Sequence, residues 1–104
     1  MEGQSLISND VLARYAADAA REVEGVSGVV DGGGLHRGKG VVISGDEQAP
    51  VVQLRVELAW GRSASEVGAA VQRRVAEYLG RMAEVRPSAV DVVVAGVGSP
   101  PAKR

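Results

Sequence analysis

The sequence predicts a two-layer α/β sandwich (α+β), in which a mixed sheet of three to four strands carries two helices on one face. Three observations support this fold class. Residues 52–60 alternate strictly between apolar and polar side chains, two helical stretches have an apolar stripe, and the elements follow the order α-β-β-β-α-β. Because a helix separates the last two strands, we expect those strands to be parallel and joined by a right-handed crossover.

Two amphipathic helices are predicted. The first covers residues 9–24, where apolar residues recur at spacings of three and four after the N-capping candidates Ser8-Asn9-Asp10, and Gly25 ends it. The second covers residues 64–83, because Ser63 and Glu66 have the spacing of a capping box and Pro87 follows. Its expected apolar face consists of Val67, Val71, Val75, Tyr78, Leu79 and Met82.

Four short segments have the pattern of strands. They are residues 26–30, 40–44, 52–60 and 90–97. We expect the first of these strands to pair antiparallel through tight turns. In the third strand, alternation predicts that Val52, Leu54, Val56, Leu58 and Trp60 face the core.

The composition indicates one ordinary globular domain without a recognisable set of catalytic residues. The chain has 104 residues, a net charge of −1, one histidine and no cysteine. We therefore expect a single domain over residues 1–97, a flexible tail over 98–104, no metal, no cofactor and no catalytic residues. No apolar run approaches the ~20 residues that span a bilayer, and the N-terminus does not resemble a signal peptide. The expected location is the cytoplasm.

The glycine-rich stretch of residues 32–40 partly matches a phosphate-binding loop. From Gly33 it reads G-x-x-x-x-G-K, but the eighth position is Gly40 where a serine or threonine would hold magnesium. Strand-like residues follow instead of a helix, so the convergent amides of a phosphate site are not expected. We interpret the stretch as a connection between two strands, whose His36, Arg37 and Lys39 are solvated or contact an acidic partner.

The second face of the sheet is the other candidate for function. The alternation places Gln53, Arg55 and Glu57 on that face, and Val42, Val93 and Val97 add apolar positions. A partly apolar open face is typical of self-association or of a protein partner, although single surface valines are also common. The candidate partner contacts are therefore Arg37, Lys39, Arg55, Val93 and Val97. The alternative function is a small RNA-binding module that uses the glycine-rich basic stretch.

An ordered set of motifs resembles the alkaline-shock-protein family of bacterial envelope stress proteins. The motifs are ISNDVLARYAADAAREVEGVSGV, KGVVI, VVQLRVELAWGRSASEVGAAVQRRVAEYLGRM and VDVVVAGV, which together span residues 7–97. Two segments depart from the family pattern. GGGLHRG is short where the family often has a longer segment, and residues 82–87 replace a M-T-G turn.

The resemblance implies a non-enzymatic, oligomeric, cytoplasmic protein with a role in envelope homeostasis under stress. It also implies a protein partner, in some members a membrane-anchored one, that recruits the protein to the inner face of the cell membrane. The resemblance supplies no functional residues that can be transferred to this chain. The expected function is therefore that of a protein-interaction or scaffold module.

Overall fold

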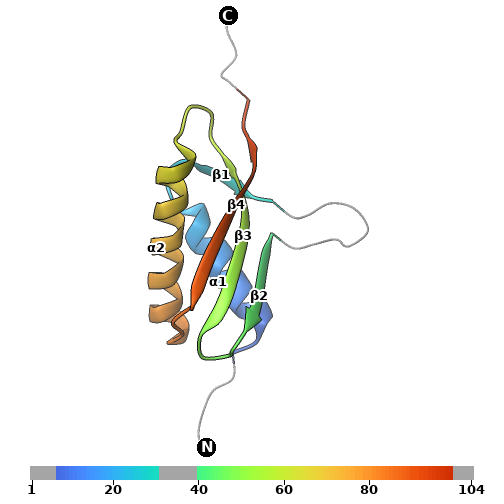
Figure 1. The fold of residues 1–104 in the computed structure, drawn as a ribbon, viewed down its shortest axis with the longest axis vertical. Helices are drawn as coiled ribbons and strands as arrows, with labels where there is room; N and C mark the ends of the chain where they lie inside the picture. Colours follow the sequence, from blue (N-terminus) through green and yellow to red (C-terminus); the bar gives the residue numbers. More distant parts are fainter. Residues whose placement is uncertain (1–6, 31–39, 100–104) are drawn as a thin grey trace, which may run out of the picture.

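A computed structural model describes residues 7–30 and 40–99 (Figure 1). In chain order the elements are α1 (Asn9–Arg21), β1 (Val26–Val29), β2 (Val41–Gly45), β3 (Pro50–Leu58), α2 (Ala64–Ala83) and β4 (Ala89–Val97). This order and the two-layer arrangement confirm the predicted fold class. Figure 1 shows the sheet in front of α1, while α2 lies alongside the margin formed by β4. The face of the sheet turned away from α1 is not covered by either helix.

The caps explain where both helices begin. The Ser8 hydroxyl accepts a hydrogen bond from the Val11 amide, and the Ser63 hydroxyl accepts one from the Glu66 amide. The helix α2 has the predicted bounds, whereas α1 ends at Arg21 and not at residue 24. Between α1 and β1, Gly25 lies at φ +101°, a conformation that favours glycine.

β3 is the central strand of the sheet. It pairs in parallel with β4 along one edge, and antiparallel with both β1 and β2 along the other. The predicted mixed sheet is thus confirmed. The antiparallel pairing of the first strands is confirmed, and it is made entirely with β3: β1 faces residues 56–58 of β3 and β2 faces residues 50–54.

β1 and β2 form one interrupted strand. Val29 lies opposite Val56 and Val41 lies opposite Leu54, so a single position remains opposite Arg55. Two residues share that position. The Val30 amide donates to the Arg55 carbonyl at 2.8 Å, and the Arg55 amide donates to the Gly40 carbonyl at 2.8 Å. The chain therefore leaves the sheet after Val30 and rejoins it at Gly40 at one point on β3.

Gly40 is required at this junction. A Cβ added to Gly40 would lie 2.6 Å from Cγ1 of Val29 and 3.0 Å from the Val30 carbonyl oxygen. Both distances are closer than van der Waals contact, so a larger residue would push the two halves of the strand apart. β2 begins directly afterwards at Val41. The residue after Lys39 thus leads into a strand and not into a helix, as expected for a connection between two β-segments.

The core lies between the sheet and the two helices. Its centre is the alternating face of β3, and Val52, Leu54 and Val56 are fully buried there. Burial of such side chains contributes about 1.5–3 kcal/mol each before conformational entropy is subtracted. α1 packs closely because its buried positions are mainly alanine, and α2 contributes Val67, Val71, Val75 and Leu79. Tyr15 and Tyr78 join the helices edge to face, with ring centroids 5.9 Å apart.

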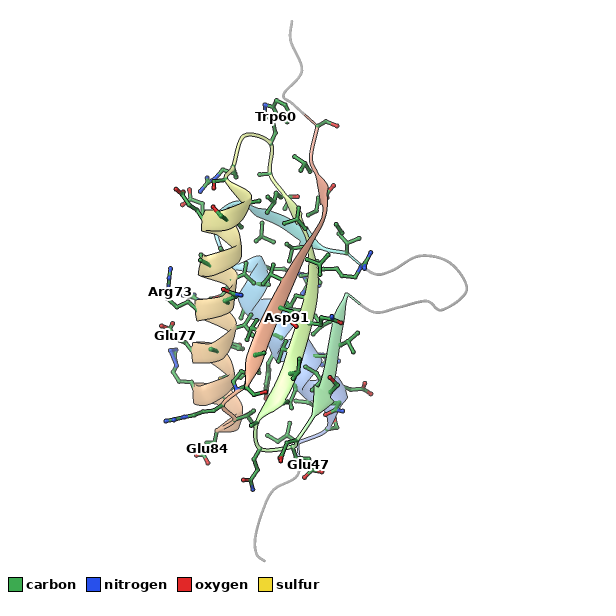
Figure 2. All side chains as sticks on the ribbon, in the orientation of Figure 1. Glu47, Trp60, Arg73, Glu77, Glu84 and Asp91 are labelled. Carbon is green, nitrogen blue, oxygen red and sulfur yellow. The ribbon has the colours of Figure 1, made fainter. Side chains whose placement is uncertain are left out.

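Three side chains differ from their predicted environments. Trp60, predicted to face the core, is 55% exposed because β3 ends at Leu58 and the chain turns at Gly61. Figure 2 shows Trp60 at the tip of the molecule, beyond the sheet. Met82 in the last turn of α2 is 48% exposed. Val97 pairs with Leu58, whose side chain faces the helices, so its predicted place on the open face is wrong.

A bulge explains the position of Val97. Val94 lies opposite Val56 and Gly96 lies opposite Glu57, which leaves Ala95 as an extra residue in β4. An extra residue reverses the alternation of side chains beyond it. Val97 therefore falls on the helix-facing side of the sheet, and it is exposed there because it lies near the end of the strand.

Candidate protein interface

The open face of the sheet consists of cross-strand rows set by the register. Val42, Gln53 and Asp91 form one row across β2, β3 and β4. Arg55 and Val93 form the next row, and Gly96 lies beside Glu57 in the row after that. Neighbouring strands lie about 4.8 Å apart, so the side chains within each row are in reach of one another. We call the five residues Val42, Gln53, Arg55, Asp91 and Val93 the open-face cluster.

The open-face cluster combines apolar and charged groups. Val42 on β2 is 47% exposed and Val93 on β4 is 41% exposed, and these two strands flank the central strand β3. Gln53, Arg55 and Asp91 are also exposed, and Arg55 has no salt bridge within the part of the chain that the structure describes. A protein interface combines apolar side chains with a polar rim, and this cluster contains both kinds of group.

The structure brings together only some of the predicted contact residues. Arg55 and Val93 are direct cross-strand neighbours, whereas Val97 belongs to the other side of the sheet. Arg37 and Lys39 lie outside the described residues, as does His36. Asp91 was not among the predicted contacts, and the register shows that it shares a row with Val42 and Gln53.

One signal for the interrupted strand was present in the sequence. The stretches with a strand pattern at residues 26–30 and 40–44 have five residues each, and the stretch at residues 52–60 has nine. Two short strands whose lengths match one longer strand can lie end to end along it, with the intervening residues outside the sheet. This arrangement places the ends of the glycine-rich stretch beside Arg55, at one margin of the open-face cluster.

The described residues show no grouping suited to catalysis or metal binding. Among residues 7–30 and 40–99, no three histidine, aspartate or glutamate side chains converge on a point that could hold a metal ion. A groove of about 950 Å³ lies where α1 begins and α2 ends, and its walls include Asp46 and Glu47. Asp46 accepts a hydrogen bond from the Gln48 amide at 2.9 Å, as in an ordinary turn.

Within residues 7–30 and 40–99, the pKa that is shifted belongs to an arginine at the contact between the helices. Arg74 donates a hydrogen bond to Oε1 of Glu22 at 2.5 Å. This hydrogen bond and the negative charge of Glu22 raise the pKa of Arg74, so the guanidinium stays charged. The pair joins α2 to the end of α1 and lies away from the open-face cluster.

No helix in the described ranges combines the length and the hydropathy that crossing a bilayer requires. Helix α2, with 20 residues, has regularly spaced arginine and glutamate side chains on its exposed side.

Several solved structures share this fold. The chain titled MamM-CTD 215-293 superposes with a TM-score of 0.60 at 18% identity, over 84% of this chain and 96% of that one. A copper form of a MamM CTD variant superposes with a TM-score of 0.60 at 18% sequence identity, over 84% of this chain and 95% of that one. A manganese form of another MamM CTD variant superposes with a TM-score of 0.60 at 18% sequence identity, over 84% of this chain and 96% of that one. At such identities the likeness establishes the fold alone.

Sequence comparison identifies the family. No curated protein matches this sequence. A family model does match, however, over residues 1–99, and it describes the alkaline shock protein 23 family with a cell envelope-related function. The match extends over nearly all of the chain, including both helices and all four described strands, and it agrees with the resemblance drawn from the motifs. The chain therefore belongs to the alkaline shock protein 23 family, a family with a cell envelope-related function.

Proposed function

We propose that this protein is a non-enzymatic interaction module of the bacterial envelope stress response, which acts by binding another protein through its open sheet face. The family's cell envelope-related function supports the biological setting. We further propose that it works in the cytoplasm and reaches the inner face of the cell membrane through a membrane-anchored protein partner.

The uncovered sheet face is the observation that carries this proposal. Both helices pack on one side of the sheet, which leaves Val42 and Val93 exposed on the other. Around them, Arg55 and Asp91 supply opposite charges that fix the orientation of a partner. A partner or a second copy that covered this face would remove both valines from water. Arg37 and Lys39 stay predicted contacts at its margin, because their chain segment rejoins the sheet beside Arg55.

The RNA-binding alternative gains no support from the family or from the fold. It depended on the glycine-rich basic stretch, and residues 31–39 lie outside the described part of the chain. The net charge of −1 also argues against a nucleic-acid binder that works through bulk charge.

The test introduces charge into the apolar part of the open face. The double variant Val42→Lys/Val93→Lys should dissociate the protein from its complex, because a lysine buried at an interface without a partner is costly. The measurement is the mass of the native protein from its source cells, by size-exclusion chromatography with light scattering. We expect the parent protein to elute in a complex and the double variant to elute near the monomer mass of 10.7 kDa.

A matched control isolates the face from the general effect of added charge. Val11, on α1, is a 38% exposed valine outside the sheet, and Val11→Lys should leave the complex intact. Thermal unfolding of all three proteins checks that each variant is folded. A parent protein that elutes as a lone monomer would contradict the proposal. Equal behaviour of the Val11 variant and the double variant would contradict it as well.

A further inference from the structure

The two charged residues of the open-face cluster, Arg55 and Asp91, lie on one diagonal of the sheet. Arg55 is in register with Val93 and Asp91 with Gln53, so the two charges are one strand apart and two residues apart along the strands. Both side chains are exposed. Among residues 7–30 and 40–99, neither side chain forms a salt bridge or a hydrogen bond. The face therefore carries one positive and one negative charge that the described residues leave without a partner.

Neutral side chains follow the other diagonal. At ideal spacings of about 4.8 Å between strands and about 3.3 Å per residue along them, the line midway between Arg55 and Asp91 passes within about 2 Å of three other positions. These positions are Val42, Gln53 and Val93, which lie in the same two rows as the charged residues. Val42 and Val93 are 47% and 41% exposed. The neutral groups thus lie along a line, and the opposite charges lie at equal distances on either side of it.

Such a surface is complementary to a copy of itself. In a contact with two-fold symmetry, residues off the axis pair reciprocally and residues on the axis meet their own counterparts. An axis along the neutral diagonal, midway between two facing sheets, would bring each Arg55 opposite Asp91 of the second copy. It would bring Val42, Gln53 and Val93 each opposite the same residue of the second copy. The strands of the two sheets would cross at roughly 70°, near the orthogonal class of sheet packing.

We infer that the open face binds a second copy of this chain in a two-fold contact, with two reciprocal Arg55–Asp91 ion pairs. Val42 and Val93 form the apolar centre of this contact. The inference rests on the proposed function, because it names the protein that the same face binds. A partner of uniform charge would place a like charge against one of the two charged residues, whereas a second copy places an opposite charge against both. A membrane-anchored protein then contacts the pair of chains outside this face.

The test uses two variants that cannot pair with themselves. Arg55→Asp gives the cluster two negative charges, and Asp91→Arg gives it two positive charges. Each variant alone places like charges opposite each other at both ion-pair positions, so its dimer should be about tenfold weaker than the parent dimer, or weaker still. An equal mixture of the two variants should form a one-to-one dimer, because every charge then meets an opposite charge. Sedimentation equilibrium of the purified chains over a range of concentrations measures each association.

Two controls separate the reciprocal pairing from the effect of charge in general. Glu47→Arg makes the same change of charge as Asp91→Arg, but in the exposed turn between β2 and β3 (Figure 2), and it should dimerise as the parent chain does. The double variant Arg55→Asp/Asp91→Arg exchanges the two charges and restores their reciprocity, so it should also dimerise as the parent does. Thermal unfolding checks that every variant is folded, which is expected because all three positions are exposed.

Three results would overturn the inference. The first is a purified parent chain that stays monomeric at every concentration, and the second is a mixture of the two variants that associates no better than either alone. The third is a Glu47→Arg variant that dimerises as weakly as Asp91→Arg. The proposed function would survive each of them if the native protein still elutes in a complex that lysines at Val42 and Val93 dissociate, because a different protein would then occupy the open face.

Discussion

Replacement of residues 30–40 by a single threonine should give a folded and more stable protein. Val29 and Val41 lie opposite Val56 and Leu54, so one residue opposite Arg55 suffices to join β1 and β2 into one strand. The native chain closes a segment of roughly ten residues at this point, at an entropic cost of about 2 kcal/mol. The loss of the half-buried Val30 side chain offsets about 1 kcal/mol of that gain.

The net gain of about 1 kcal/mol corresponds to a rise in melting temperature of about 4–8 °C for a domain of this size. Thermal unfolding followed by far-ultraviolet circular dichroism measures it. As a control, residues 31–39 are replaced by glycine and serine at the same length, which should leave the melting temperature close to that of the parent. A threonine variant that is unfolded, or that melts below the parent, would refute the interpretation of β1 and β2 as one interrupted strand.

Four further substitutions test the core, a helix cap and an ion pair by urea unfolding. Leu54→Ala should lower the free energy of unfolding by about 2–5 kcal/mol, because Leu54 is fully buried at the centre of β3. Trp60→Ala should lower the free energy of unfolding by about 1 kcal/mol or less, because Trp60 is exposed. A larger decrease for Trp60→Ala would contradict the placement of Trp60 outside the core. Ser63→Ala should cost about 1 kcal/mol through loss of the cap of α2, and no change would contradict that role. Arg74→Ala should lower the free energy of unfolding only slightly, since the side chains of its pair with Glu22 are about half exposed, and the difference should shrink in about 1 M salt. A cost that is insensitive to salt would contradict an electrostatic contribution.

Local patterns predicted most of the elements because each has a strong local cause. The hydroxyls of Ser8 and Ser63 mark the starts of the helices, and the alternation from Val52 to Leu58 marks the central strand. The parallel pairing of β3 with β4 follows from the helix between them. These features depend on residues close in sequence, and the structure agrees with them.

The differences arise where long-range register decides the outcome. The place of β1 and β2 on one edge of β3 depends on pairing across the sheet, which short-range periodicity does not report. The same reason applies to Val97, because the extra residue Ala95 reverses the alternation only through its mismatch with β3. For the candidate interface, the sequence identified Arg55 and Val93, but their contact across two strands required the topology.

Site-specific photo-crosslinking tests the central claim most directly. A benzophenone amino acid placed at position 93 on the open face is compared with the same amino acid at position 11 on α1, in the source cells under ultraviolet light. Both positions are exposed valines in the native protein, at 41% and 38%, so they offer similar access. The account predicts a discrete crosslinked protein product from position 93 and none from position 11. Products of equal yield from both positions, or no product from position 93, would contradict a partner bound to the open sheet face.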